Sequence, residues 1–288
     1  MIKIIASDMD GTLLNDQMVI SEKNADAIKQ AQALGVHFIV STGRGYTEVK
    51  PLITAAGFNS PMITFNGAEV LNEDGETLNT TPISDEVAQT LVQLFKKEGF
   101  YFEMTTSNGV YSDNRASRIQ NVARLISDTN PDTPFKMAVS LAAARLELMN
   151  INYVDDYQTV IDDPKIDIFK LIVFSMDGQE KLTPLKTKIE AEDSLVVTSS
   201  APTNLEINNI NAQKGIALQA FAKGLNIPMS DVMAIGDNLN DVSMLKVAGV
   251  SYAMENGHDE VKRIANHSAK TNSEDGVGLA ILEQLAEK

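Results

Sequence analysis

Strands and helices alternate at both ends of this chain, and this pattern restricts its fold more than any other feature. Near the N-terminus, apolar runs rich in β-branched residues occupy 2–7, 36–42 and 61–65, and helical segments occupy 21–35 and 46–57. From about residue 212 the alternation returns, with strands expected at 231–237 and 250–254 and helices at 212–227, 239–249, 259–269 and 276–288. Continuous apolar runs between helices are typical of parallel strands buried on both faces. The sequence therefore predicts an α/β fold with a Rossmann-like parallel-sheet core.

A different pattern in the middle of the chain indicates a second domain. Hairpins are expected at 68–83 and 100–113, helices at 85–99, 114–126 and 135–150, and strands at 167–175, 194–200 and 204–209. Hairpins mixed with helices are typical of an α+β unit with an antiparallel sheet. We expect the core to comprise residues 1–82 and 209–288, with an inserted α+β cap domain at 83–208.

The charge balance argues against several classes of partner. Asp and Glu number 39 and Lys and Arg number 24, so the formal net charge is −15. Such a surface repels nucleic acid and anionic membranes, but a local cationic pocket can still bind a phosphorylated ligand. The chain has no cysteine, which excludes disulfides and thiolate metal sites. Neither a signal peptide nor an apolar membrane span is expected, and we predict a cytoplasmic protein.

Two carboxylates at the end of the first strand suggest chemistry. Asp8 and Asp10 directly follow the buried run and are themselves followed by Gly11 and Thr12. Their mutual repulsion would destabilise the fold unless something cationic compensates. A metal ion, another bound cation and a catalytic pair all satisfy this requirement.

Polar residues also follow the other expected core strands. Ser41–Arg44, Asn66-Gly67 and Gly236–Asp241 come at the carboxyl ends of their strands, which is the edge where open parallel sheets bind ligands. Asp8, Asp10 and Asp237 offer the oxygen ligands that suit Mg²⁺. Thr42 offers a hydroxyl, Gly43 allows close backbone approach, and Lys214 begins a helix whose N-terminus favours an anion. Together these groups suit a phosphoryl ligand, with one aspartate as nucleophile and a second as acid and base.

The order and separation of four motifs resemble those of the haloacid dehalogenase superfamily. These motifs are DMDGTLL at residue 8, STGR at residue 41, KG at residue 214 and GDNLND at residue 236. The large insertion between the second and third motifs, together with TFNGAEV and EDGV, is similar to the Cof-type phosphatases. The resemblance covers nearly the whole core and the size of the insertion.

The resemblance implies a role for each matching residue. Asp8 is expected to be the nucleophile and a Mg²⁺ ligand, and Asp10 the general acid and base, with its backbone carbonyl on the metal. Asp237 is expected to bind Mg²⁺, and Asp241 to support the metal from the second layer of residues. The phosphate would contact the Met9 and Gly43 N–H groups, Thr42, Lys214 and Asn240. Arg44 could recognise substrate or pair with an acid, and both readings stay open.

These inferences predict a Mg²⁺-dependent phosphatase for small phosphorylated metabolites. Sugar phosphates are the first expected class, and pyridoxal or flavin phosphates are open alternatives. A phosphomutase on the same scaffold is a second hypothesis, and a non-catalytic protein that binds phosphorylated metabolites is a third. A capped chain needs no partner subunit to complete its site, so no oligomer is required.

Overall fold

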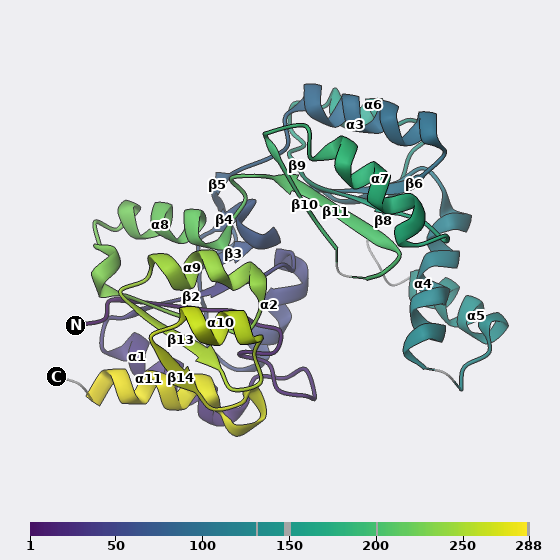
Figure 1. Ribbon diagram of the computed structural model, residues 1–288. Coiled ribbons are helices and arrows are strands. Elements are labelled where there is room, and N and C mark those ends of the chain that lie inside the picture. The colour runs from purple at the N-terminus through teal and green to yellow at the C-terminus, as the bar shows by residue number, and fades with distance from the viewer. Residues whose placement is uncertain (131, 147–150, 200, 287–288) are drawn as a thin grey trace. The chain divides into compact units, whose positions relative to one another are not determined.

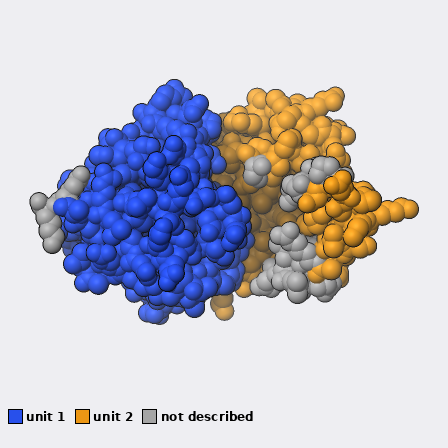
Figure 2. Space-filling view, turned by 90° about the horizontal axis from the view of Figure 1, so that it is seen from below, with its two compact units in different colours: residues 1–81, 211–288 blue, residues 82–210 orange. Residues whose placement is uncertain are grey.

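The computed structural model describes residues 1–130, 132–146, 151–199 and 201–286. The chain divides into two compact units, residues 1–81 with 211–288 and residues 82–210, coloured blue and orange in Figure 2. The boundaries expected from the sequence, 82/83 and 208/209, lie within two residues of these limits. Each unit contains its own sheet, and apolar residues pack against that sheet within the unit.

The first unit is built on one sheet whose strands run in the order β14-β13-β12-β1-β2-β3-β4-β5. The bounds are β1 (Ile4–Ser7), β2 (His37–Ser41), β3 (Met62–Thr64), β4 (Glu69–Leu71), β5 (Thr77–Thr80), β12 (Val232–Gly236), β13 (Val250–Met254) and β14 (His267–Ala269). The strands from β14 to β3 pair in parallel, and β4 and β5 add an antiparallel hairpin at the edge. The fold class expected from the sequence is therefore confirmed.

Helices cover both faces of this sheet because the strand residues alternate between two apolar cores. Ile5 packs in the core that contains α1 (Glu22–Ala33), α2 (Tyr46–Ala55) and α11 (Gly276–Ala286). Ile4 and Ala6 pack in the core of α8 (Lys214–Gly224), α9 (Val242–Val247) and α10 (Asp259–Ile264). In Figure 1, α1 and α11 lie together on one side of the sheet, and α8 and α9 lie on the other.

The helix expected over 259–269 is wrong in its second half. α10 ends at Ile264, and β14 pairs in parallel with the edge strand β13. The Asn266 N–H donates to the Ser251 hydroxyl at 3.1 Å, and the His267 ring stacks on Tyr252 with centroids 4.8 Å apart. These contacts with an unfilled sheet edge outweigh the local helical preference of the segment.

The second unit has a mainly antiparallel sheet in the order β10-β11-β9-β6-β7-β8. The bounds are β6 (Tyr101–Thr106), β7 (Gly109–Ser112), β8 (Ile151–Tyr153), β9 (Ile168–Phe174), β10 (Leu195–Thr198) and β11 (Asn204–Asn209). Its helices are α3 (Asp85–Glu98), α4 (Arg115–Thr129), α5 (Phe135–Leu146), α6 (Gln158–Ile161) and α7 (Gln179–Ile189). The sequence pattern did not predict α7, which has Pro184 in its interior. The end of the helix expected over 135–150 lies outside the described residues.

No helix in the described parts of the chain combines the length and apolar character needed to cross a membrane.

Candidate active site

Three buried or half-buried carboxylates meet at the carboxyl edge of the first unit's sheet. Asp8 follows β1, and Asp237 and Asp241 follow β12; one oxygen from each lies within 4.8 Å of the others. Asp8 is 4% exposed and Asp241 is fully buried. Carboxylate oxygens that converge in this way are the ligands that hard divalent cations such as Mg²⁺ prefer.

Lys214 joins two of these carboxylates. Its Nζ donates to Asp8 Oδ1 and to Asp241 Oδ1, both at 2.6 Å, and its side chain is fully buried. When all three carboxylates are ionised, the single ammonium leaves two negative charges uncompensated in the group. A divalent cation would balance this charge, so the donor set fits a divalent metal ion.

Both carboxylate oxygens of Asp241 accept hydrogen bonds from other groups of the protein. While Oδ1 accepts from Lys214, Oδ2 accepts the backbone N–H groups of Asp237 and Asn238 at 2.9 and 3.0 Å. Gly236 allows this close approach, since a Cβ there would lie 2.6 Å from the Asp241 carboxylate. Asp241 therefore shapes the loop that carries Asp237.

Asp237 is held by the residues that follow the first motif. The Thr12 hydroxyl donates to Asp237 Oδ1 at 2.8 Å. Gly11 has φ +78, and a Cβ there would lie 2.5 Å from Asp237 Oδ2. The loop after β1 thus needs both a left-handed backbone and the absence of a side chain at this position.

Burial perturbs the acid–base properties of this group. Burial, together with the negative charge of Asp241, raises the pKa of Asp8 well above the usual aspartate value, although Lys214 opposes the shift. Burial also raises the pKa of Asp237, with Asp241 adding to the shift and the Thr12 hydrogen bond opposing it. For Lys214, burial lowers the pKa, but Asp241 and Asp8 outweigh burial, so the pKa lies above the usual lysine value.

Asp10 is paired with a different cation from Asp8. Arg44 donates from Nε to Asp10 Oδ2 at 2.8 Å and from Nη2 to Asp10 Oδ1 at 2.5 Å. The hydrogen bond to Asp10 raises the pKa of Arg44, and burial opposes that shift. In this structure Arg44 therefore pairs with an acid, and its recognition of substrate stays a prediction. The two aspartates of the first motif have separate compensating charges.

The remaining predicted residues lie on adjoining loops. Thr42 is fully buried after β2, and its hydroxyl accepts the Arg44 N–H at 3.2 Å. Gly43 lies beside Asn66, whose Oδ1 would be 3.2 Å from a Cβ at position 43. Met9 is buried, and its carbonyl accepts the Leu14 N–H at 2.8 Å. The loop after β1 is therefore folded back as a tight turn.

Asn240 is brought to this edge by a contact that the sequence did not predict. Its exposed side chain donates from Nδ2 to Asn66 Oδ1 at 3.0 Å, although 174 positions separate the two residues. Asn256 also supports the site, because its Nδ2 donates to the Gly11 carbonyl at 2.7 Å. The position of Asn66 after a core strand was the available signal. Asn256 offered no comparable signal.

Comparison with known proteins identifies the family. A family model described as haloacid dehalogenase-like hydrolase matches residues 5–281. The chain belongs to this family. The predicted superfamily resemblance is thereby confirmed.

Similar hydrolases cover nearly the whole chain. Phosphatase YwpJ of Bacillus subtilis (strain 168) is 32% identical over 277 residues, which are 96% of this chain and 97% of that protein. The 5-amino-6-(5-phospho-D-ribitylamino)uracil phosphatase YwtE of the same strain is 31% identical over 285 residues, 99% of this chain and 98% of that protein. A solved haloacid dehalogenase-like hydrolase from B. subtilis has a TM-score of 0.79 and 31% identity, with 98% of this chain and 99% of that chain covered. The predicted activity class, a phosphoric monoester hydrolase, is confirmed.

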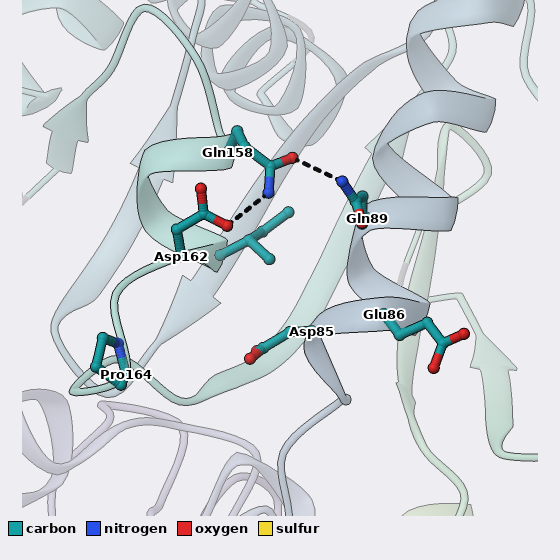
Figure 3. A pocket seen from close by; sticks show the side chains of 7 residues that line it. Asp85, Glu86, Gln89, Gln158, Asp162 and Pro164 are labelled. Atoms are coloured by element: carbon teal, nitrogen blue, oxygen red, sulfur yellow. Dashed lines mark hydrogen bonds between the residues drawn. The ribbon is translucent and has the colours of Figure 1, made fainter.

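A pocket in the second unit contains none of these site residues. Its cavity volume is about 430 Å³, and Figure 3 shows its lining residues: Asp85, Glu86, Gln89, Gln158, Ile161, Asp162 and Pro164. Asp85 and Glu86 occupy the first turn of α3, where negative charge stabilises the helix dipole. The Gln158 side chain joins Gln89 and Asp162 through hydrogen bonds of 3.2 and 2.8 Å. Structural roles therefore account for the polar groups of this pocket.

Proposed function

We propose that this hydrolase is a Mg²⁺-dependent phosphatase that cleaves small phosphorylated metabolites through an aspartyl-phosphate intermediate. One observation carries the proposal. Lys214 bridges Asp8 and Asp241 in a buried group that keeps two excess negative charges. A nucleophilic carboxylate held by a lysine, beside room for a divalent cation, suits attack on a phosphoryl group.

In the first half-reaction Asp8 acts as the nucleophile. A carboxylate oxygen of Asp8 attacks phosphorus while the bond from phosphorus to the leaving-group oxygen breaks. Asp10 donates its proton to that oxygen, so an alcohol leaves. In the second half-reaction water attacks phosphorus, the aspartyl oxygen–phosphorus bond breaks, and Asp10 accepts a proton from the water. Inorganic phosphate and free Asp8 are the result.

The other predicted residues bind and neutralise the phosphate. The Met9 and Gly43 N–H groups, the Thr42 hydroxyl and the Asn240 side chain would donate hydrogen bonds to its oxygens. Lys214 would offset charge on both Asp8 and the phosphate. Arg44 forms an ion pair with Asp10 in the free enzyme and would also contact the substrate.

The metal would be held by Asp8 and Asp237 through their side chains and by Asp10 through its backbone carbonyl, with Asp241 in the second layer. Mg²⁺ bound there would supply positive charge to the transferring phosphoryl group. All of these residues lie in one unit of a single chain, so the proposal needs no oligomer. A cytoplasmic location remains a prediction.

Phosphate release from a panel of substrates tests the proposal. The panel contains sugar phosphates, pyridoxal 5′-phosphate, flavin mononucleotide and a ribityl phosphate, because the name of YwtE specifies a phosphoribitylamino substrate. Each is assayed with Mg²⁺ and with excess chelator. We expect Mg²⁺-dependent release, with sugar phosphates preferred. Activity that survives chelation would contradict the metal requirement.

An Asp8→Asn variant tests the nucleophile. We expect release to fall at least about a thousandfold while the protein stays folded by circular dichroism, because the amide cannot form the acyl phosphate. Undiminished activity in this variant would reject the intermediate. If the wild-type protein releases no phosphate, transfer between two hydroxyls of one substrate would support a phosphomutase, and binding without turnover would support a non-catalytic role.

A further inference from the structure

A three-residue turn after β3 connects motifs that are distant in the sequence. The turn, Phe65–Gly67, forms a short 3₁₀ helix. The Phe65 N–H donates to the Arg44 carbonyl at 3.1 Å, and the Asn66 N–H donates to the Thr42 carbonyl at 2.9 Å. On its other side, a Cβ at Gly67 would lie 2.5 Å from the Gln213 backbone, directly before Lys214. The turn therefore contacts the second motif on one side and the residue before the third motif on the other.

Asn66 occupies the centre of this turn in a left-handed conformation. Its φ is 60 and its ψ is 23. Asparagine adopts this region more readily than most residues, so the position can carry a polar side chain where the backbone would otherwise favour glycine. That side chain reaches the fourth motif, because Asn66 Oδ1 accepts from Asn240 Nδ2 at 3.0 Å.

The bond couples the orientation of the Asn240 carboxamide to that of Asn66. A carboxamide presents an acceptor on one side and two N–H donors on the other. With one N–H of Asn240 directed at Asn66 Oδ1, the second N–H on the same nitrogen is available to an anionic oxygen. With Asn66 in this orientation, reversal of the Asn240 amide alone would place two carbonyl oxygens against each other, which is unfavourable. Asn240 is exposed, so solvent would otherwise allow both orientations.

We propose that Asn66 is a positioning residue that holds the Asn240 carboxamide so that its second N–H faces the substrate phosphate. This inference rests on the proposed phosphatase function and on the expected contact between Asn240 and phosphate. It predicts that Asn66 affects phosphate binding through Asn240 and has little effect on bond cleavage. Its loss should therefore raise KM and the inhibition constant of inorganic phosphate, with a smaller change in kcat.

The test uses an Asn66→Gly variant, because glycine keeps the left-handed backbone and removes only the side chain. We expect KM and the phosphate inhibition constant to rise about 3- to 10-fold, the scale of one lost hydrogen bond. Asn226→Gly is the matched control. Asn226 is also a left-handed asparagine, with φ 56, but it is exposed between α8 and β12. The control should leave both constants unchanged, and thermal melts would confirm that each variant is folded.

A double-mutant cycle with Asn240→Ala separates positioning from direct binding. If Asn66 acts through Asn240, Asn66→Gly should have no further effect in the Asn240→Ala background. An equal effect in both backgrounds would overturn the proposal and indicate that Asn66 binds substrate itself. Unchanged constants in Asn66→Gly would also overturn it. If the proposed phosphatase function is wrong, the wild-type enzyme itself will show no turnover. Calorimetric titration of inorganic phosphate into the Mg²⁺-loaded variants would then test the same double-mutant cycle through binding alone.

Discussion

Each unit of this hydrolase buries a cation against carboxylate, but only one of the two groups is electrically balanced. In the first unit, Lys214 faces Asp8 and Asp241 while Asp237 lies nearby, so negative charge is in excess. In the second unit, Arg118 on α4 pairs with Glu103 on β6, one charge against one. Glu103 is fully buried, and the side chain of Arg118 is 13% exposed.

Neutral partners complete the group in the second unit. The Tyr101 hydroxyl donates to Glu103 Oε1 at 2.6 Å and lies 2.8 Å from the Ser112 hydroxyl. Burial, with Glu103 adding to the effect, raises the pKa of Tyr101, so the hydroxyl keeps its proton. The comparison teaches that charge balance distinguishes a structural pair from a site prepared for a further cation.

Replacement of the buried lysine or arginine by an uncharged residue should have the largest effect on stability. Lys214→Met and Arg118→Met would each leave buried carboxylate uncompensated, and we expect each to lower the free energy of unfolding by about 3–5 kcal/mol without metal. Mg²⁺ should restore part of the stability of Lys214→Met and none of that of Arg118→Met. Thermal melts with Mg²⁺ and with chelator measure this difference. Equal responses of the two variants to Mg²⁺ would show that charge balance does not distinguish the two groups.

Asp237→Asn should change stability by a smaller amount, and the sign of the change should differ between the metal-free and the Mg²⁺-bound protein. Without metal, we expect a gain of about 0.5–2 kcal/mol at neutral pH, because the substitution removes a repelling charge. With Mg²⁺, the variant should lose most of the stabilisation that the metal gives to the wild-type protein. Melting curves in both conditions check the prediction, and an undiminished Mg²⁺ response would exclude Asp237 as a ligand.

The pH dependence of the same variant sharpens this test. Because the pKa of Asp237 is raised in the folded protein, the folded state binds its proton more tightly than the unfolded state. Its contribution to stability therefore declines as pH rises from the usual aspartate range through the raised pKa. We expect a smaller decline in Asp237→Asn than in wild type, both measured in chelator. A steeper decline in the variant would contradict the shift.

Substitutions at two glycines should have the smallest effects on stability. They separate the cost of backbone strain from the cost of a steric clash. Gly11 and Gly99 both have positive φ, but only Gly11 has a neighbour that a Cβ would strike. Gly99→Ala should cost about 1 kcal/mol and leave phosphatase activity unchanged. Gly11→Ala should cost at least as much and also reduce activity about tenfold, since it displaces Asp237. Denaturant titrations and phosphate release measure the two quantities. Full activity in Gly11→Ala would show that the loop adapts.

The sequence alone determined the layout of the core and the types of residue at its edge. Apolar runs alternating with helices predict parallel strands, and parallel strands in one sheet end at the same edge, where Asp8, Thr42 and Asp237 were expected. The same local reasoning failed at residues 267–269, where pairing with β13 replaced the expected helix. It also missed α7, whose interior proline weakened its pattern.

The pairing of the charged side chains became evident only in the tertiary structure. Sequence spacing could not show that Lys214 joins Asp8 to Asp241 and that Arg44 pairs with Asp10. Nor could it show that Asn240 donates a hydrogen bond to Asn66. In the second unit, the sequence likewise gave no sign that Arg118 and Tyr101 contact the buried Glu103. The physical reason is range: secondary structure follows local periodicity, whereas these side-chain pairs join positions that folding brings together from as many as 206 residues apart.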